Sequence, residues 1–354
     1  MPIDEVNSEN IGTAIETRVL EQFASATLMI EIESTKIPTA TVAPTDVLIE
    51  SIPTIETEQW FEENQWQNPN EESGFAEVLT IPAVIYASPQ DAVEKGLPKR
   101  TLPGDEVYVS FNLQDSYESE AVYEVEEAGW MAGDQLSLIT PSSFAGITIQ
   151  DVPVNGLGWV VEPTFSSFFD DGNSTQKRHA HYYQRYQLFK VLSQVTDEQG
   201  GTWYEIVPGE WISDDHFSFV HLRENLPSQA TSQRWIDVNL TEQNLVVYEA
   251  GKPIFATLIS TGAKQGWTYA GMFTIFNMLE THDLFSPDPK GIGNYYLEDV
   301  PWILFYEGSL AIHGAYWHDS FGLPNSHGCV NMSIRDAGWL YEWAQPSDYV
   351  FLFW

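Results

Sequence analysis

The sequence predicts an α+β protein that is mostly β, with two small β-rich modules followed by a mixed-sheet C-terminal domain. Three observations support this fold class. Short runs of β-branched and aromatic residues recur with turn residues about every 8–12 positions. Glycine and proline total 44 of 354 residues, 24 and 20 respectively, which suits many short strands. A single well-defined helix, with a good N-cap, is expected near the C-terminus.

We expect four parts along the chain. They are an acidic, Thr/Pro-rich leader or linker at 1–75, a β-rich module at 76–150, a second β module at 151–228, and the C-terminal domain at 229–354. Closely spaced prolines in the first part favour extended chain. A short helix is predicted from Ile11 to Phe23. A tether and a tail without a specific role are equally compatible with the rest of this part.

In the two central modules, short strand-like runs separated by turn residues predict small barrels or sandwiches. Runs such as AVIYAS and DEVYVSF belong to the first module, and GWVVEPTF and TWYEIV to the second. The segment TWYEIVPGEWI resembles the end of a bacterial SH3-like module. This resemblance implies two SH3-like modules, and leaves open whether they bind glycan.

The C-terminal domain begins with a predicted meander, IDVNL, LVVYE and IFATLIS, joined by turns. Residues 302–312 predict a hairpin. A helix is predicted over 333–344, with Ser333 as N-cap and Asp336 in capping-box position. The terminal DYVFLFW predicts a buried strand.

The composition excludes several partners. The formal charge is −36, so nucleic acid is not expected as a partner. No run of 18 apolar residues predicts a membrane-spanning helix. The acidic first ten residues lack the features of a signal peptide. Cys329 is the one cysteine, so no disulfide forms within the chain. We expect a monomer.

The chemistry concentrates in AIHGAYWHDSFGLPNSHGCVNMS, residues 311–333. Cys329 follows a glycine-bearing turn just before the predicted helix, where a thiolate is stabilised. His313 ends a predicted strand and could fold back to act as general base. Backbone N–H groups at Gly328 and Cys329 could stabilise an oxyanion.

Two other interpretations of this window are possible. His313, His318, His327 and Cys329 are acceptable zinc ligands, but their spacing lacks a paired-ligand motif. Alternatively, Cys329 is a structural cysteine in a turn beside histidines. The combination of two glycines and two histidines around one thiol favours catalysis.

The sequence Ser326-His-Gly-Cys-Val-Asn331, preceded by His313-Gly314, resembles the signature of the YkuD-type L,D-transpeptidase catalytic domain. The resemblance covers residues 232–354. It implies a YkuD-like mixed sheet in which Cys329 is the nucleophile, His313 its base and the Gly314 carbonyl the group that orients the imidazole. His327 and Gly328 would belong to the oxyanion environment. The implied substrate contacts are Ser326, Asn331, Tyr295, Tyr296 and Trp302.

The resemblance implies an enzyme that forms 3→3 cross-links between peptidoglycan stem peptides through a Cys329 thioester, without a cofactor or metal. It would act outside the cytoplasm, in the cell envelope or wall. One alternative is an L,D-carboxypeptidase or amidase with the same nucleophile. Another is a noncatalytic wall-binding adaptor. Stem-peptide chemistry and the export route are left open.

Overall fold

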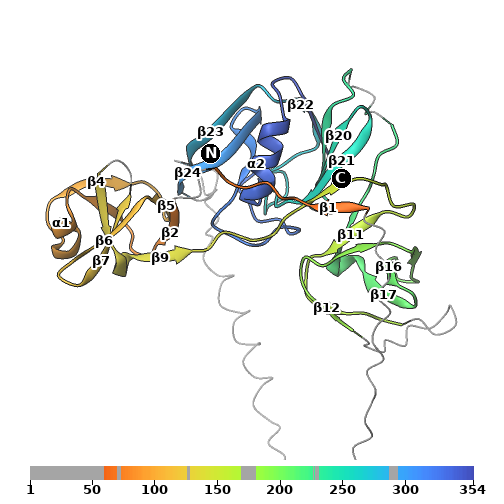
Figure 1. Ribbon diagram of the computed structural model, residues 1–354, viewed down its shortest axis with the longest axis horizontal. Helices are drawn as coiled ribbons and strands as arrows, with labels where there is room; N and C mark the ends of the chain where they lie inside the picture. Colours follow the sequence, from red (N-terminus) through yellow and green to blue (C-terminus); the bar gives the residue numbers. More distant parts are fainter. Residues whose placement is uncertain are drawn as a thin grey trace, which may run out of the picture. The chain divides into compact units, whose positions relative to one another are not determined.

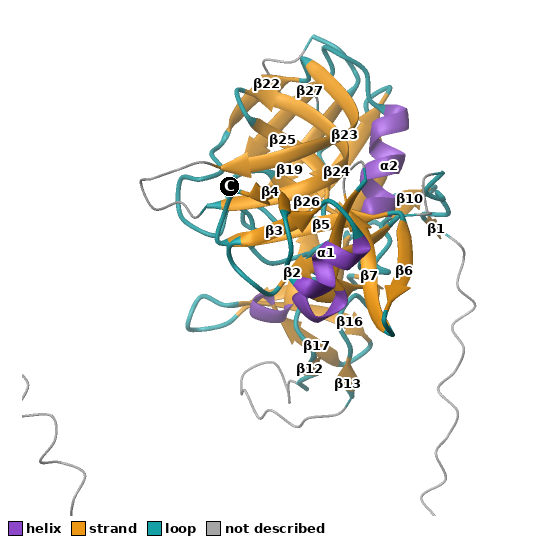
Figure 2. Ribbon diagram, turned by 90° about the vertical axis from the view of Figure 1, so that its left-hand side faces the viewer, coloured by secondary structure: helices purple, strands orange, loops and turns teal. Residues whose placement is uncertain are grey.

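The computed structural model describes residues 60–354 except 70–72, 126–127, 169–180, 226, 228–230 and 287–293. The predicted helix from Ile11 to Phe23 and most of the predicted leader lie outside the described residues. Strands dominate the described part of the chain, and a short helix precedes the last strand (Figure 2). The predicted mostly β fold class is therefore confirmed.

The C-terminal domain has the predicted elements. Its bounds are β19 (Trp235–Asn239), β20 (Asn244–Glu249), β21 (Lys252–Leu258), β22 (Gly271–Thr274), β23 (Asn277–Ser286), β24 (Tyr295–Glu307), β25 (Leu310–Gly314), β26 (Val330–Met332), α2 (Ile334–Trp343) and β27 (Tyr349–Phe353). β24 and β25 form the predicted hairpin, and β27 pairs in parallel with β19. Helix α2 packs against β24 and β25 (Figure 1).

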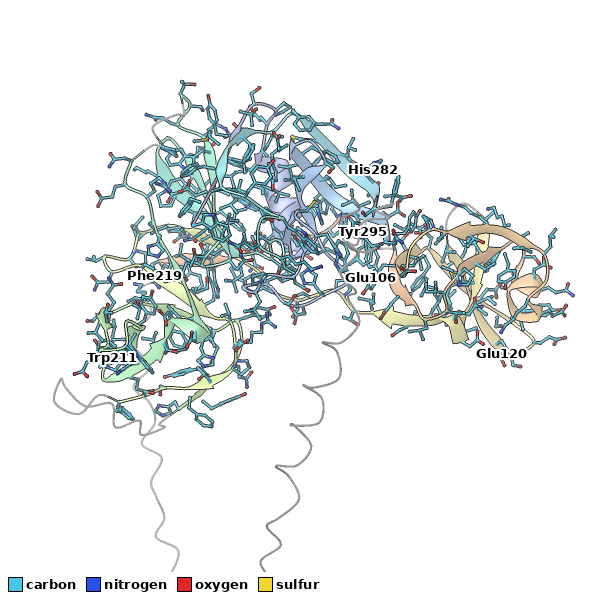
Figure 3. The ribbon with its side chains drawn as sticks, turned by 180° about the vertical axis from the view of Figure 1, so that it is seen from behind. Glu106, Glu120, Trp211, Phe219, His282 and Tyr295 are labelled. Carbon is cyan, nitrogen blue, oxygen red and sulfur yellow. The ribbon has the colours of Figure 1, made fainter. Side chains whose placement is uncertain are left out.

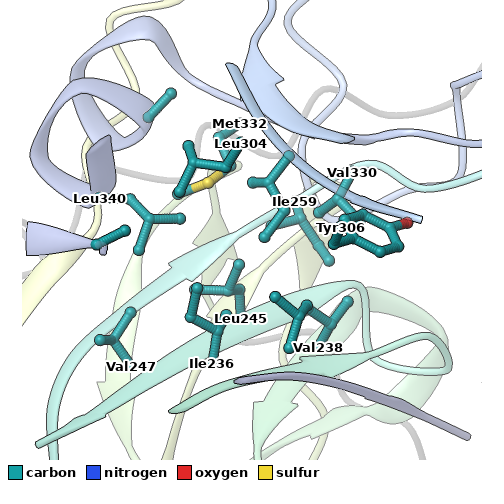
Figure 4. Close-up of a cluster of buried hydrophobic side chains, with 14 of the residues drawn as sticks. Ile236, Val238, Leu245, Val247, Ile259, Leu304, Tyr306, Val330, Met332 and Leu340 are labelled. Carbon is teal, nitrogen blue, oxygen red and sulfur yellow. The ribbon is translucent and has the colours of Figure 1, made fainter. Parts of the chain in front are cut away.

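Two sheets enclose the main hydrophobic core. Within the described residues, one has the order β1-β10-β21-β20-β19-β27-β22. The other has the order β26-β25-β24-β5-β2-β9, with β23 also paired to β24. Ile236 and Leu245 from the first sheet meet Leu304 and Met332 from the second, and Leu340 of α2 closes the cluster (Figure 4). These residues lie on facing surfaces because apolar residues alternate along the strands and recur on one side of the helix.

The first sheet recruits two strands from outside the predicted C-terminal domain. β1 (Phe61–Glu63) pairs with β10 (Ile147–Ile149), which pairs with β21. The end of the predicted leader is therefore not a tether, because β1 belongs to the folded unit. The Asn64 N–H donates to the Gly146 carbonyl at 2.8 Å, so the chain leaves and re-enters this sheet at one point.

The chain between these two strands forms the first module. Its bounds are β2 (Gly74–Val78), β3 (Ala83–Tyr86), α1 (Pro89–Glu94), β4 (Pro98–Leu102), β5 (Glu106–Phe111), β6 (Leu113–Tyr117), β7 (Glu120–Val125), β8 (Gly129–Ala132), a 3₁₀ turn (Gly133–Gln135) and β9 (Leu136–Ile139). Here β4-β3-β8-β7-β6 form one sheet, while β5 continues a sheet of the C-terminal domain through a parallel pairing with β24. Its SH3-like character stays a prediction.

The second module follows β10. Its bounds are β11 (Leu157–Val160), β12 (Thr164–Phe165), β13 (Tyr182–Tyr183), β14 (Leu188–Lys190), β15 (Ser193–Thr196), β16 (Thr202–Val207), β17 (Glu210–Ser213), a 3₁₀ turn (Asp214–His216) and β18 (Phe217–Val220). Trp159 and Val220 of this module share a buried cluster with Trp235 and Val246. Successive residues of β19 and β20 face opposite sides of the sheet. The main core covers one face, and the second module covers the other. No helix among the described residues has the length and apolarity needed to cross a bilayer.

Candidate active site

The turn that carries Cys329 is fixed by hydrogen bonds within and around it. The Ser326 hydroxyl accepts from the Gly328 N–H at 3.0 Å and donates to the Cys329 carbonyl at 2.6 Å. The Thr268 hydroxyl donates to the Gly328 carbonyl at 2.7 Å. Gly328 has φ +135°, and an added Cβ would lie 2.9 Å from the Trp267 carbonyl oxygen. Both the backbone conformation and the close approach require glycine there.

His313 is held as a neutral base. It lies on β25, opposite Asn331 of β26. Its Nδ1 is 3.1 Å from the Gly314 carbonyl oxygen, which can only accept, so Nδ1 carries the proton and Nε2 has the free lone pair. The side chain is 2% exposed. Burial lowers the pKa of His313 to about 4, and the Gly314 carbonyl partly offsets this.

Cys329 is a thiol rather than a thiolate in the free protein. Burial raises its pKa to about 11, against a smaller lowering by the Ala311 backbone. The side chain is only partly buried, and its Sγ lies 3.8 Å from the Ser309 carbonyl oxygen. The expected help from the helix N-terminus is wrong, because strand β26 separates Cys329 from α2.

A cavity of about 250 Å³ brings nucleophile and base together. Six of the predicted site residues line it, namely Cys329, His313, His327, Ser326, Asn331 and Tyr295. The His327 ring stacks on Trp267 and contacts the tilted ring of Tyr295, with centroids 5.3 and 4.7 Å away. A thiol and a neutral imidazole on one cavity, with the outer nitrogen of the imidazole free, can carry out acyl transfer.

Comparison with known proteins agrees with this geometry. Residues 233–352 match the family model of the YkuD L,D-transpeptidase catalytic domain. Residues 233–352 are a YkuD catalytic domain. A protein of Bacillus subtilis (strain 168), YciB, provisionally named an L,D-transpeptidase, is 27% identical over 134 residues. This match spans 30% of the chain and 59% of YciB.

Solved structures also resemble this YkuD domain. A mutant of Enterococcus faecium L,D-transpeptidase is 23% identical, with 34% of this chain and 50% of that chain covered and a TM-score of 0.32. An L,D-transpeptidase from Stackebrandtia nassauensis is 31% identical, with 36% and 58% covered and a TM-score of 0.29.

Two predicted substrate contacts do not line the cavity of the YkuD domain. Successive residues of a strand face opposite sides, so Tyr296 points away from the cavity that Tyr295 lines. The Tyr296 hydroxyl donates to Asp283 at 2.7 Å. Trp302 is buried between Trp66 and Tyr341, with ring centroids 5.2 and 5.3 Å away. Both residues have packing roles.

The predicted oxyanion environment is also revised. Because the Gly328 N–H already donates to Ser326, the Cys329 N–H is the remaining candidate donor of the predicted pair. His327 forms an aromatic wall of the cavity. Burial, the main cause, lowers its pKa.

The His318 side chain contacts the side chain of Asn331. Its Nδ1 accepts from the Ser320 N–H at 3.2 Å, so its proton lies on Nε2, which is 3.1 Å from the Asn331 side-chain amide. Turning that amide so that Oδ1 accepts from Nε2–H also gives a partner to the otherwise unpaired Oδ1. Among the described residues, no three His, Cys, Asp or Glu side chains are grouped to hold a metal.

Two cavity residues come from outside the YkuD domain and were not predicted. Glu106 and Tyr108 of β5 line the cavity opposite the nucleophile turn. The alternation in DEVYVSF indicates that these two residues share a face, while Val107 and Val109 enter the module core. Nothing in the sequence indicates that β5 pairs with β24, some 190 residues later.

Proposed function

We propose that this protein is a peptidoglycan L,D-transpeptidase that joins stem peptides by 3→3 cross-links through a Cys329 thioester. The observation that carries the proposal is the shared cavity of Cys329 and His313, with His313 oriented by the carbonyl of its own neighbour. The protein would act in the cell envelope, where its substrate lies.

The proton remains on sulfur until a substrate is bound, because the thiol pKa lies far above that of the imidazole. Cys329 Sγ attacks the carbonyl carbon of the third stem residue while His313 Nε2 takes the thiol proton. The peptide C–N bond breaks, and the imidazolium protonates the departing D-Ala amine. This leaves a thioester on Cys329.

The second half-reaction regenerates the thiol. A free amine of another stem attacks the thioester carbon, the C–S bond breaks, and one amine proton passes through His313 to the sulfur. In this mechanism the Cys329 N–H stabilises the oxyanion of both tetrahedral intermediates, a contribution of about 3 kcal/mol. If water replaces the amine, the same site acts as an L,D-carboxypeptidase.

Ertapenem is a suitable first probe, since a structure of the acylated Enterococcus faecium catalytic domain carries it. We expect an intact-mass adduct of one ertapenem on the wild-type protein and none on Cys329→Ala. A His313→Gln variant should acylate at least a hundredfold more slowly. Muropeptide digests then separate cross-linked dimers from trimmed tripeptides. The adaptor hypothesis requires that no adduct forms.

A further inference from the structure

The cavity has a wall that the first module supplies, and this wall bears a carboxylate. We propose that Glu106 is a specificity-determining residue that binds the ammonium group of the amine acceptor. The inference rests on the proposed transpeptidase function and deepens it. It assigns the choice between amine and water partly to a module outside the catalytic domain.

The position of Glu106 is set by backbone pairing. Its partner in the parallel β5–β24 ladder is Tyr295, which lines the cavity and whose ring lies 4.7 Å from that of His327. The Asp105 and Glu106 N–H groups both donate to the Asn294 carbonyl, at 2.8 and 3.2 Å. Figure 3 shows Glu106 close to Tyr295, where the module meets the catalytic domain.

Gly104 allows this close approach. It has φ +110°, and an added Cβ would lie 3.1 Å from the Asn294 carbonyl oxygen and 3.2 Å from the Tyr295 carbonyl carbon. The turn before β5 therefore lies directly against the start of β24. A side chain at this position would strain the backbone and crowd the start of β24.

Further contacts hold β5 against the catalytic domain. The Ser110 N–H donates to the Glu298 carboxylate at 3.0 Å, and its hydroxyl donates to Asp299 at 2.6 Å. The Phe75 ring stacks on Tyr316, with centroids 4.0 Å apart. Ser110, Glu298 and Tyr316 are buried, so these contacts hold β5 in place beside the site.

The electrostatics favour a cation at this wall. Of the described residues that line the cavity, Glu106 is the one carboxylate, and no lysine or arginine lines it. The three cavity histidines, His313, His318 and His327, all have pKa values lowered by burial and do not neutralise it at pH 7. Burial has the larger effect on the pKa of His327, in the turn that carries Cys329, and the Glu106 charge acts in the opposite direction.

An acceptor amine is mostly ammonium at neutral pH. Glu106 would concentrate it beside the thioester by a charge-assisted hydrogen bond. The bound ammonium loses one proton to water before the nitrogen attacks. Water and uncharged nucleophiles gain nothing from the carboxylate, so the residue biases partition toward transfer.

The test compares two nucleophiles on one thioester. The enzyme is acylated with a synthetic tetrapeptide stem ending in D-Ala. It is then offered Nα-acetyl-lysine amide, a cation, or hydroxylamine, which is uncharged at pH 7. For Glu106→Gln we expect the KM of the lysine amide to rise about tenfold. Hydroxylamine and the rate of thioester formation should change less than about twofold.

Glu120→Gln is the matched control, because Glu120 is an exposed carboxylate of the same module that lies away from the cavity (Figure 3). It should behave as wild type, and both variants should melt at the wild-type temperature. An equal effect of Glu106→Gln on both nucleophiles, or none on either, overturns the inference while the proposed function stands. Failure of the wild type to form the thioester overturns both.

Discussion

At the scale of single residues, the Cys329 thiol and the His313 imidazole are both neutral in the free protein. Cys329 packs against an apolar cluster that includes Ala311, and burial disfavours its thiolate. His313, also buried, is a weak base with a free Nε2. The thiol of such a site loses its proton only as it attacks a bound carbonyl, because the negative charge then moves to the carbonyl oxygen. This limits side reactions of a partly exposed thiol.

This neutral pair predicts a distinctive pH dependence of alkylation. Because the pKa of Cys329 is about 11, its thiolate fraction rises about tenfold per pH unit from pH 7 to 9. We expect the rate of iodoacetamide alkylation, followed by intact mass, to rise with that slope. His313→Ala should keep the slope, since His313 is already neutral over this range. A plateau below pH 8 would instead indicate a resting thiolate–imidazolium pair.

Most residues that line the candidate site could be predicted from the sequence because they lie within one turn and one hairpin. Ser326, Gly328 and Cys329 are joined by local hydrogen bonds within the motif. The substrate wall could not be predicted in the same way. Which of two adjacent tyrosines, Tyr295 or Tyr296, faces the cavity depends on strand register, which a sequence does not define.

At the scale of elements, helix α2 is held by the buried Asp336 carboxylate, a role that its capping pattern did not predict. Ser333 accepts from the Asp336 N–H, as predicted. The Asp336 carboxylate, however, does not complete a capping box. It is buried and accepts from Asn64, from the Gly146 N–H at 2.9 Å and from the Thr257 hydroxyl. One side chain thus joins the helix to three other segments.

Removing this acceptor should cost much of the stability. Asp336→Ala removes a buried acceptor shared by three donors, so we expect the free energy of unfolding to fall by about 3–5 kcal/mol. Burial raises the pKa of Asp336, so the neutral Asp336→Asn should lose less. Urea denaturation measures both. Asp134→Ala, at an exposed position, should stay within about 0.5 kcal/mol of wild type. Equal losses for Asp336→Ala and Asp134→Ala would contradict this role.

The individual strands of the C-terminal domain could be predicted because their alternation is regular and their turns are short. Pairings between distant segments could not. The three-residue strands β1 and β10 carry too few positions to show periodicity. Their placement on β21 depends on contacts made only in the folded chain.

At the scale of the whole molecule, the first module is inserted into a hairpin. β1 and β10 pair directly, and the hydrogen bond from Asn64 to Gly146 closes the gap between the ends of the insertion. Domains inserted through adjacent ends are removable in principle, because the host chain needs little loop to reconnect.

Replacing residues 65–145 with a short Gly/Ser linker should therefore give a folded protein. We expect cooperative unfolding with a melting temperature about 5–10 °C lower, because β24 loses β5 and Tyr316 loses Phe75. Ertapenem should still acylate Cys329, whereas the preference for cationic amines should disappear. Scanning calorimetry and the two-nucleophile assay measure these outcomes. An insoluble or unacylated product would show that the module is essential to the host fold.

The two faces of β5 serve different purposes, since one packs in the module core and the other lines the cavity. Val107 and Val109 fill the interior of the module, and Glu106 and Tyr108 furnish the catalytic cavity. Substitutions that repack the interior of this module would shift β5 and change the position of the Glu106 carboxylate. A substitution on one face of the strand must therefore be compensated on the other. Among homologous chains, substitutions at positions 107 and 109 should therefore covary with those at 106, and lineages with different cross-bridge amines should differ at both.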